Sequence, residues 1–382
     1  MRGFGVSWVE ELEDAVKHAR DGCAQLRGEE VGNWFQECVQ IHNDIINVMR
    51  RKSTPLPIKD GLNPTRIRIH GAPPTGMRAA DAVAEVIFSQ RHRHPDDTWD
   101  AIYQRFRDNE VVRHNGTPLS PDELLPENCE LFFYKTPAPE TTVPYRLPII
   151  HRDDDLLVVH KPPFMATMPR ARHIVQTATV QLRRLTGIPE LSPAHRLDRL
   201  TSGLVVFTTR PELRGPYQTL FAQRQVSKVY EAIAPYDSRL AQSLADGRLT
   251  WRSRLEKNPG ELQGRFVDGE PNAITHLEAI TQCSAAEQAE LEKIHGRQPP
   301  LAHYRLAPVT GKTHQLRLHM WAAGVPILGD PVYPRIYAED EEDFAVPMHL
   351  IAREISFTDP LSGTHRRFRT PLSVSDTFEG TA

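Results

Sequence analysis

The 382-residue sequence predicts a mixed α+β fold, built on a mainly antiparallel β-sheet with flanking helices. From about residue 149 onward, short β-type runs alternate with helical segments, and no internal repeat or low-complexity segment interrupts them. The composition is that of an ordinary globular chain, with 39% hydrophobic and 25% charged residues. The length is sufficient for two or three domains.

The N-terminal part of the chain contains a helical segment followed by a proline-rich one. Residues 1–50 carry apolar side chains at helical spacing, so we expect a helical extension there. Three prolines in residues 51–65 break this pattern and predict a linker. Met49 stands just before the linker, which leaves open the hypothesis that the native product starts at that residue.

Residues 66–136 predict a small α+β module. The stretch DDTWDAIYQRFRDNE is helical, with its aromatic residues on one side, and Asn115-Gly116 is a hairpin signal before the strand CELFFYK. The proline-rich residues 137–148 predict a second linker.

The larger domain is expected to span residues 149–372, with a tail at 373–382. Five strands and three helices are predicted within it. The strands cover 155–161, 203–209, 227–234, 302–309 and 353–359, and the helices cover 211–224, 283–297 and 312–323.

Charge is distributed unevenly although the formal net charge is only −3. Between His160 and Tyr230 the chain has eleven Lys and Arg against three acids. Such a basic stretch is typical of a polyanion-binding surface, and ordinary charge fluctuation explains it equally well.

Several function classes are disfavoured. Four cysteines without a CxxC pair and histidines without ligand spacing predict no disulfide framework, metal site or cofactor. The GKT of residues 311–313 lacks the rest of a phosphate-binding loop, and no GxSxG elbow is present. No apolar stretch could span a membrane, and the N-terminus is too acidic for a signal peptide, so we expect a cytoplasmic protein without membrane partners.

The stretch PAHRLDRLTSGLVVF places one carboxylate, Asp198, between Arg196 and Arg199. Tyr230 in the strand SKVYEA and Arg317 in GKTHQLRLHM are two further candidates for chemistry. Each has a plain structural explanation, because an Asp–Arg pair is commonly a salt bridge and a strand tyrosine commonly belongs to the core.

Taken together, these segments resemble the RluA-type pseudouridine synthases over residues 149–371. HRLDRLTSG matches the HRLDxxTSG signature of that family, and GKTHQLRLHMWAAGVPILGDPVY resembles its GRTHQIRxHxxxxGxPIxGDxxY block. LLVVHKP, SKVYEA and MHLIAREISFTDPLSG occur in the expected order. The sequence departs from the pattern in three places: Phe164 and Met165 stand where a glycine usually follows KP, Lys312 replaces a common arginine, and Pro334 replaces a glycine.

The resemblance implies the pseudouridine synthase fold and isomerisation of uridine in structured RNA, without a cofactor or metal. Asp198 would be the catalytic carboxylate, attacking the sugar or the base or removing a sugar proton. Arg317 would hold it bidentately. Tyr230 would stack on the detached uracil and serve in the later removal of the proton from its ring carbon five. Leu318 is either part of the uracil pocket or plain core.

The expected RNA contacts are made by basic residues around the carboxylate. They are Arg196, Arg199, Lys161, Lys228, Lys312 and His314. We expect ribosomal RNA, most of all that of the large subunit, as substrate, with transfer RNA as the alternative. An RNA-binding assembly factor without turnover and a hydrolase are weaker alternatives. Residues 66–136 would resemble the small RNA-binding module of such enzymes, and we expect a monomer.

Overall fold

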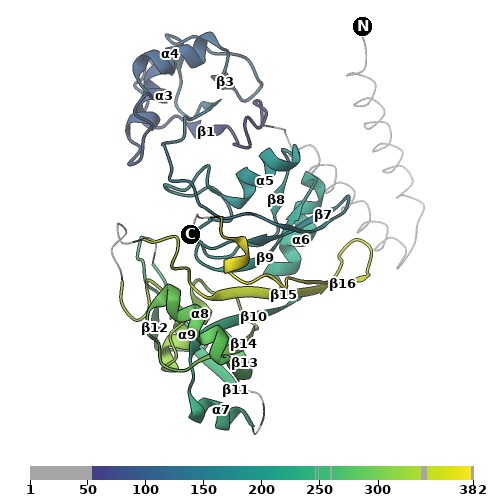
Figure 1. Cartoon of the computed structure of the whole chain (residues 1–382). Coiled ribbons are helices and arrows are strands. Elements are labelled where there is room, and N and C mark those ends of the chain that lie inside the picture. The colour runs from purple at the N-terminus through teal and green to yellow at the C-terminus, as the bar shows by residue number, and fades with distance from the viewer. Residues whose placement is uncertain (1–53, 246, 248, 259, 337–341, 380–382) are drawn as a thin grey trace, which may run out of the picture.

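The computed structural model describes residues 54–245, 247, 249–258, 260–336 and 342–379. The helical extension expected at 1–50 and the hypothesis about Met49 therefore lie outside the described residues. The described chain forms a small N-terminal body and a larger body that contains the long sheet (Figure 1). Among these residues no helix is both long and apolar enough to cross a bilayer.

The small body consists of two helices and short antiparallel strands. The strands are β1 (Thr65–Arg68), β5 (Glu130–Phe133) and β3 (Val112–Arg113) in one sheet and β2 (Met77–Arg78) with β4 (Leu124–Leu125) in another, beside α3 (Ala79–Phe88) and α4 (Trp99–Arg107). Helix α4 begins after Thr98, whose side chain accepts a hydrogen bond from the Ala101 N–H. Gly116 takes the positive φ of 85° that the turn after β3 requires. The helix and the strand predicted here are confirmed.

The larger body is organised by one long sheet, with the strand order β12-β11-β13-β14-β10-β15-β9-β7-β6 in the described residues. All of its neighbouring strands pair antiparallel except β9 and β15, which pair in parallel. The strands are β6 (Ile149–Arg152), β7 (Leu156–Lys161), β9 (Ser202–Thr208), β10 (Val226–Pro235), β11 (Leu249–Glu256), β12 (Arg265–Val267), β13 (Ala273–Gln282), β14 (Leu301–Pro308) and β15 (Leu350–Thr358), with β8 (Ser192–Pro193) beside β9 and β16 (His365–Arg369) beside β15. The predicted α+β class with a mainly antiparallel sheet is confirmed.

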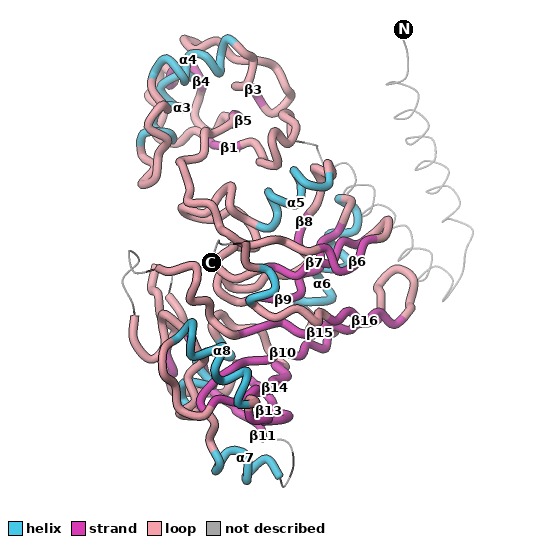
Figure 2. Tube along the Cα trace, in the orientation of Figure 1, coloured by secondary structure: helices cyan, strands magenta, loops and turns pink. Residues whose placement is uncertain are grey.

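Helices lie against this sheet, as the cyan segments of Figure 2 show. They are α5 (Ala178–Thr186), α6 (Pro211–Ala222), α7 (Ser238–Ala245), α8 (Ala285–His295) and α9 (Gln315–Ala322), and a 3-10 turn, η3, covers Ser375–Thr377. Helix α9 begins three residues later than predicted because His314, at its N-terminus, has a left-handed backbone with φ 60°.

The two faces of the sheet bury different residues. On β10, Ala232 and Ala234 belong to the main core together with Leu316 of α9. Ile233 points the other way and packs against Leu291 of α8. Helices α8 and α9 therefore cover opposite faces of the same strands.

The proline-rich segments expected as linkers are packed against the folded bodies. The Arg183 guanidinium in α5 donates to the Gly61 carbonyl at 2.9 Å, which ties residues near the small body to the larger one. Within the second expected linker, the Tyr145 ring is buried and contacts Phe378 at 5.0 Å between centroids. Phe378 belongs to the expected tail, so this segment too is held by the core.

A fully buried histidine, His160, makes the stability of the fold sensitive to acid. His160 at the end of β7 is 0% exposed, and its Nδ1 lies 2.8 Å from the Thr370 hydroxyl. Burial, and then the charges of Lys161 and Arg353, lower its pKa from 6.5 to about 4. The unfolded chain therefore binds the proton more tightly, and stability falls as the pH falls from 6.5 toward 4.

Between pH 6.5 and 4, the free energy of unfolding of the wild type should fall more steeply with falling pH than that of His160→Asn. We expect the two slopes to differ by about 1 kcal/mol per pH unit. The measurement is urea unfolding at several pH values between 7 and 4 for both proteins. An unchanged slope in the variant would show that other groups cause the acid sensitivity.

Candidate active site

The turn that carries Asp198 is pinned by two buried polar side chains. The Lys161 ammonium at the end of β7 donates to the carbonyls of Pro162 at 2.7 Å, Met165 at 2.8 Å and Arg199 at 3.1 Å. The Thr167 hydroxyl donates to the Leu197 carbonyl at 3.0 Å and accepts from the Leu197 N–H at 3.1 Å. These bonds fix the backbone on both sides of Asp198.

Phe164 explains one departure from the family pattern. Its φ of 63° lies in the left-handed region that a bulky residue rarely adopts and that glycine adopts freely. The phenylalanine thus occupies a backbone position suited to the glycine expected there. Its buried ring packs edge-on against Phe344 at 5.1 Å between centroids, and this contact offsets the backbone cost.

Gly203 at the end of the signature is required by a close approach of two strands. It has φ +108°, and a Cβ on it would lie 2.4 Å from the Ala352 carbonyl oxygen of β15. Only glycine allows β9 to pair with β15 at this point. The pairing places the turn of Asp198 beside the central strands.

A cavity of about 370 Å³ opens above this turn. It lies between the turn of Asp198, strand β10 and the N-terminus of α9. The side chains that line it include Asp198, Tyr230, Arg317, Arg196, Lys228, Lys312, His314, Leu197, Leu316 and Leu350. Its lining combines apolar side chains with a larger number of polar and charged ones, and charged groups that converge on one small space are typical of a ligand site.

Arg317 is paired differently from the sequence prediction. Its Nε and one terminal nitrogen each lie 2.7 Å from an oxygen of Asp330, and both side chains are buried. Asp330 also accepts the backbone N–H groups of Val332 at 2.8 Å and Tyr333 at 3.1 Å. The expected bidentate hold on Asp198 is therefore wrong, because the planar guanidinium is already used by Asp330.

Within the described residues, the Asp198 carboxylate has no ion-pair or hydrogen-bond partner of its own, and it faces the cavity half-buried. The Arg317 guanidinium interacts with this carboxylate: burial lowers the pKa of Arg317, but Asp330 and, to a smaller degree, Asp198 raise it above its ordinary value. A carboxylate left unpaired beside a fixed positive charge is available to a substrate.

Tyr230 lies in the same cavity with its hydroxyl protonated. Burial, and then the Asp198 charge, raise the pKa of this phenol far above its ordinary value. Near neutral pH the hydroxyl of the free protein is therefore a hydrogen-bond donor.

Among the basic residues predicted to contact RNA, four line the cavity: Arg196, Lys228, Lys312 and His314. Arg196 and Lys312 are exposed, whereas Lys228 is half-buried and has its pKa lowered by burial and by Arg224. One ring nitrogen of His314 is already used within the protein, because its Nδ1 lies 3.0 Å from the Tyr333 hydroxyl.

Three predicted site residues do not line this cavity. Lys161 is 0% exposed with its ammonium bonded to three carbonyls, so a contact with RNA is wrong for it. Arg199 forms an ion pair with Glu342 and borders a neighbouring cavity with Phe164. Leu318 is fully buried against Leu255, so the core explanation holds and the uracil-pocket one is wrong.

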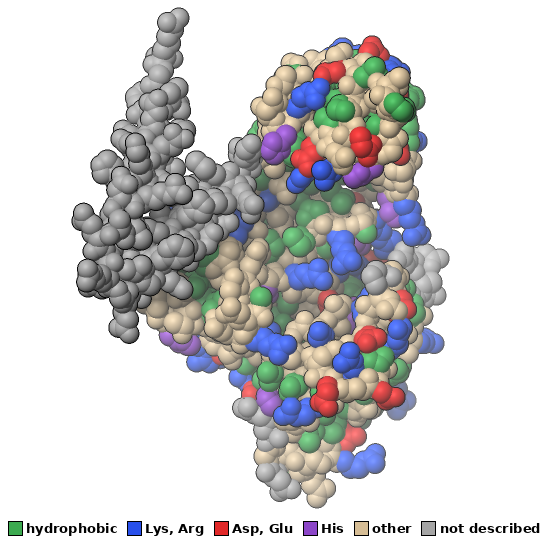
Figure 3. Space-filling view, turned by 180° about the vertical axis from the view of Figure 1, so that it is seen from behind, with side chains coloured by type: hydrophobic (Ala, Val, Ile, Leu, Met, Phe, Trp, Pro, Cys, Tyr) green, Lys and Arg blue, Asp and Glu red, His purple; other side chains and the backbone are tan. Residues whose placement is uncertain are grey.

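Part of the basic surplus of the sequence is neutralised in the fold. Arg184, Arg199, Arg210 and Arg214 each pair with an acid, and Lys161 is buried. On the face shown in Figure 3, Lys and Arg side chains are spread among acidic, hydrophobic and uncharged ones. Of the basic side chains left over, Arg196 and Lys228 line the cavity, and Lys312 lies beside them.

Sequence reasoning missed Asp330, which holds Arg317, and the apolar cavity residues Leu197, Leu316 and Leu350. The GDPVY segment was recognised as part of a motif, and an acid in a motif with a buried arginine could have identified the pair. The leucines carry no such signal, because they are indistinguishable from core residues in the sequence.

Comparison with known proteins decides the family. Residues 155–322 match the family model described as RNA pseudouridylate synthase. The dual-specificity RNA pseudouridine synthase RluA of Haemophilus influenzae is 31% identical over 229 residues, which are 59% of this chain and 92% of that protein. The chain belongs to the RluA-type pseudouridine synthases. Such a synthase is an isomerase acting on RNA, and both the signature turn of Asp198 and the Arg317 helix lie within the matched residues.

A second curated protein and one solved structure are also similar to this RluA-type synthase. The ribosomal large subunit pseudouridine synthase D of Neisseria meningitidis serogroup A is 28% identical over 277 residues, covering 68% of each chain. The solved structure of human RNA Pseudouridylate Synthase Domain Containing 1 has 25% sequence identity and a TM-score of 0.46, and covers 61% of this chain and 86% of that one.

Proposed function

We propose that this synthase isomerises a uridine of ribosomal RNA, in the large subunit, with Asp198 as the catalytic carboxylate. The observation that carries the proposal is the unpaired Asp198 carboxylate, which faces a cavity bordered by Tyr230, Arg317 and exposed basic side chains. The choice of RNA rests on the relative named a ribosomal large subunit synthase, whose match extends over 68% of the chain, against 59% for the RluA of Haemophilus influenzae.

The chemistry requires a carboxylate near the sugar of the substrate. Cleavage of the bond between uracil N1 and the anomeric carbon separates charge, and an anionic group at the sugar stabilises it by attack or electrostatically. The uracil then turns and is rejoined through C5, the C5 proton passes to Asp198 or to solvent, and N1 gains a proton. A neutral Tyr230 beside Asp198 would stack on the detached ring.

The target uridine must leave its stack to reach this cavity. Flipping costs a few kcal/mol, and contacts to the surrounding phosphates supply the compensating affinity. Arg196, exposed on the turn of Asp198, is placed to occupy the space that the base vacates. Lys312 and Lys228 at the rim would contact the RNA backbone, and the small N-terminal body would add a second contact to the RNA.

Transfer RNA is the alternative substrate, supported by the relative named a dual-specificity RNA synthase. We further propose that the enzyme acts as a monomer in the cytoplasm, where both RNAs are modified. A deletion strain whose total RNA is mapped for pseudouridine beside wild type tests the substrate. Loss of a site from large-subunit RNA supports the proposal, and loss from transfer RNA alone contradicts it.

Lys312 gives a direct test of the rim contact. We expect Lys312→Ala to weaken RNA binding several-fold and to lower the salt slope of the binding constant by about 1, because one phosphate contact is lost. The measurement is filter binding to substrate RNA at several salt concentrations. Lys293→Ala is the matched control, since Lys293 is an exposed α8 lysine paired only with Glu290. Equal effects of both substitutions would assign the loss to net charge and not to this rim.

A further inference from the structure

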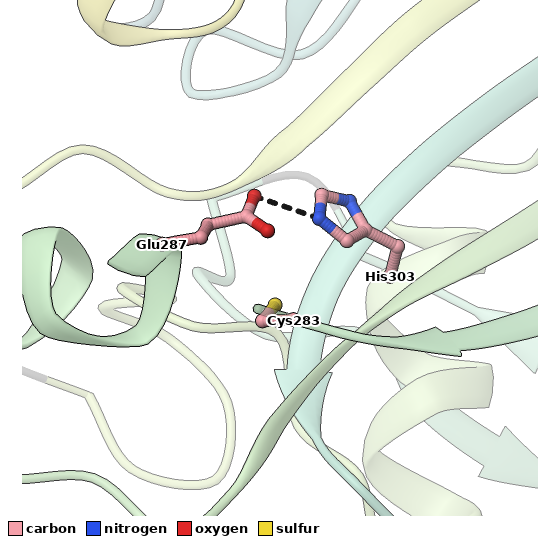
Figure 4. A group of neighbouring side chains, drawn as sticks. All are labelled: Cys283, Glu287 and His303. Atoms are coloured by element: carbon pink, nitrogen blue, oxygen red, sulfur yellow. Dashed lines mark hydrogen bonds and ion pairs between the residues drawn. The ribbon is translucent and has the colours of Figure 1, made fainter. Parts of the chain in front are cut away.

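Three side chains with metal-ligand chemistry meet on the sheet face opposite the Asp198 cavity (Figure 4). Cys283 follows β13, Glu287 lies in the first turn of α8, and His303 lies in β14. One ligand atom of each lies within 4.8 Å of the others. The group is partly buried, so an ion could enter from solvent while being held mainly by protein atoms.

The cluster is separated from the catalytic cavity by the sheet itself. Glu231, whose carboxylate contacts His303, follows Tyr230 directly in β10. Neighbouring residues of a strand point to opposite faces, so Tyr230 faces the cavity and Glu231 faces the cluster. The leucines that pack beside Cys283, Leu291 and Leu301, lie on this same face.

The backbones of the three residues are fixed before any ion binds. The Cys283 N–H donates to the Leu301 carbonyl at 2.9 Å, which continues the pairing of β13 with β14. His303 is opposite Thr281 in this pairing. Ser284 caps α8 by accepting the Glu287 N–H at 3.2 Å. Ligands on a strand end, a central strand and a capped helix turn are held with the precision that a metal site needs.

His303 has a carboxylate near each of its ring nitrogens, and metal-binding histidines commonly have such a partner on the nitrogen that does not bind the metal. Its Nε2 lies 2.7 Å from Oε1 of Glu287, and its Nδ1 lies 3.4 Å from Oε1 of Glu231. The same Glu231 oxygen accepts from Arg353 at 2.6 Å. A carboxylate beside the second ring nitrogen is a common partner of a metal-binding histidine, and it leaves Nε2 for a metal.

From these contacts we propose that Cys283, Glu287 and His303 bind a zinc ion, with a water molecule in the fourth position. A thiolate, an imidazole and a carboxylate form a donor set that suits zinc, whereas the sulfur disfavours magnesium and calcium. Zinc ligands in tetrahedral geometry lie about 3.5 Å apart, so small side-chain rotations close the site. Binding transfers the Cys283 S–H proton to solvent and forms the Zn–S bond.

The protonation states predict how binding depends on pH. Burial, and then Glu287, raise the pKa of the free Cys283 thiol to about 12. The ion pair with Glu231, followed by the Glu287 charge and against burial, raises the pKa of His303. Zinc must displace protons from both groups, so its affinity increases with pH.

Cobalt(II) added to the metal-stripped full-length protein tests the site, because a cobalt–thiolate bond gives a charge-transfer absorption band. We expect the band at one cobalt per chain, competed away by zinc, and its loss in Cys283→Ser and in His303→Gln. Cys129→Ser is the matched control, since Cys129 is a free, partly buried cysteine in the small body, and it should keep the band. Glu231→Gln should bind about 10–100-fold more weakly.

Zinc should also raise the melting temperature of the wild type and of Cys129→Ser, but not of Cys283→Ser. This readout is independent of pseudouridine formation, so failure here leaves the catalytic proposal intact. A band that is absent, or that persists in Cys283→Ser, overturns the inference. In that case His303 serves as a cation between Glu231 and Glu287 without a metal.

Discussion

Asp198→Asn should lower pseudouridine formation by about 10³-fold or more, with little change in stability. The amide is close in volume to the carboxylate but carries no charge and is a poor nucleophile, so the charge separation at the sugar is no longer stabilised. The side chain faces the cavity without a partner among the described residues, so its replacement breaks no ion pair there. Tritium release from RNA that carries 5-tritiated uridine measures the loss.

Two controls separate chemistry from folding and from binding. The melting temperature of Asp198→Asn should stay within a few degrees of the wild type, because surface-facing polar substitutions usually change stability by less than about 0.5 kcal/mol. RNA affinity should be retained, since Arg196 and Lys312 remain at the rim. Persistent tritium release in this variant would exclude Asp198 as the catalytic group. Loss of both RNA binding and the cooperative unfolding transition would instead indicate a structural role.

The sequence was sufficient to predict the fold class and the elements around the site, because they are encoded locally. The alternation of β10, the amphipathic pattern of α6 and the proline at the start of α6 are each visible within a dozen residues. The prolines that predict linkers at residues 51–65 and 137–148 are visible in the same way. Proline content signals irregular backbone, but it does not reveal that Tyr145 and Phe378, far apart in the chain, meet in the core.

The partners of charged residues were less predictable than their positions. Lys161 reads as a surface lysine in the sequence, and only the turn that wraps around it supplies the three carbonyls that bind its ammonium. Arg317 lies thirteen residues from Asp330 but more than a hundred from Asp198, and the nearer acid receives the guanidinium. Whether an ion pair forms depends on tertiary geometry, and charge patterns alone do not encode it.

The buried pair of Arg317 and Asp330 is expected to have the largest effect on stability. Asp330→Asn should lower the free energy of unfolding by about 3–5 kcal/mol, because it leaves the guanidinium charge buried without its counter-charge. The side chains of Arg317 and Asp330 are only 3% and 0% exposed, so water cannot compensate. Urea unfolding at neutral pH measures the change. A loss below about 1 kcal/mol would show that the pair is solvated in solution.

A double variant separates the structural role of the pair from its electrostatic role in catalysis. Arg317→Met combined with Asp330→Leu removes both charges and should recover part of the lost stability, since apolar residues of similar volume replace a buried ion pair well. Recovery stays partial because the N–H groups of Val332 and Tyr333 lose their acceptor. Turnover should nevertheless remain about 10²-fold below wild type, because the positive charge beside Asp198 is gone. A stable double variant with wild-type turnover would mean that Arg317 only supports the fold. A stable but slow one would show that the same guanidinium holds α9 to Asp330 and stabilises the charge that develops at Asp198.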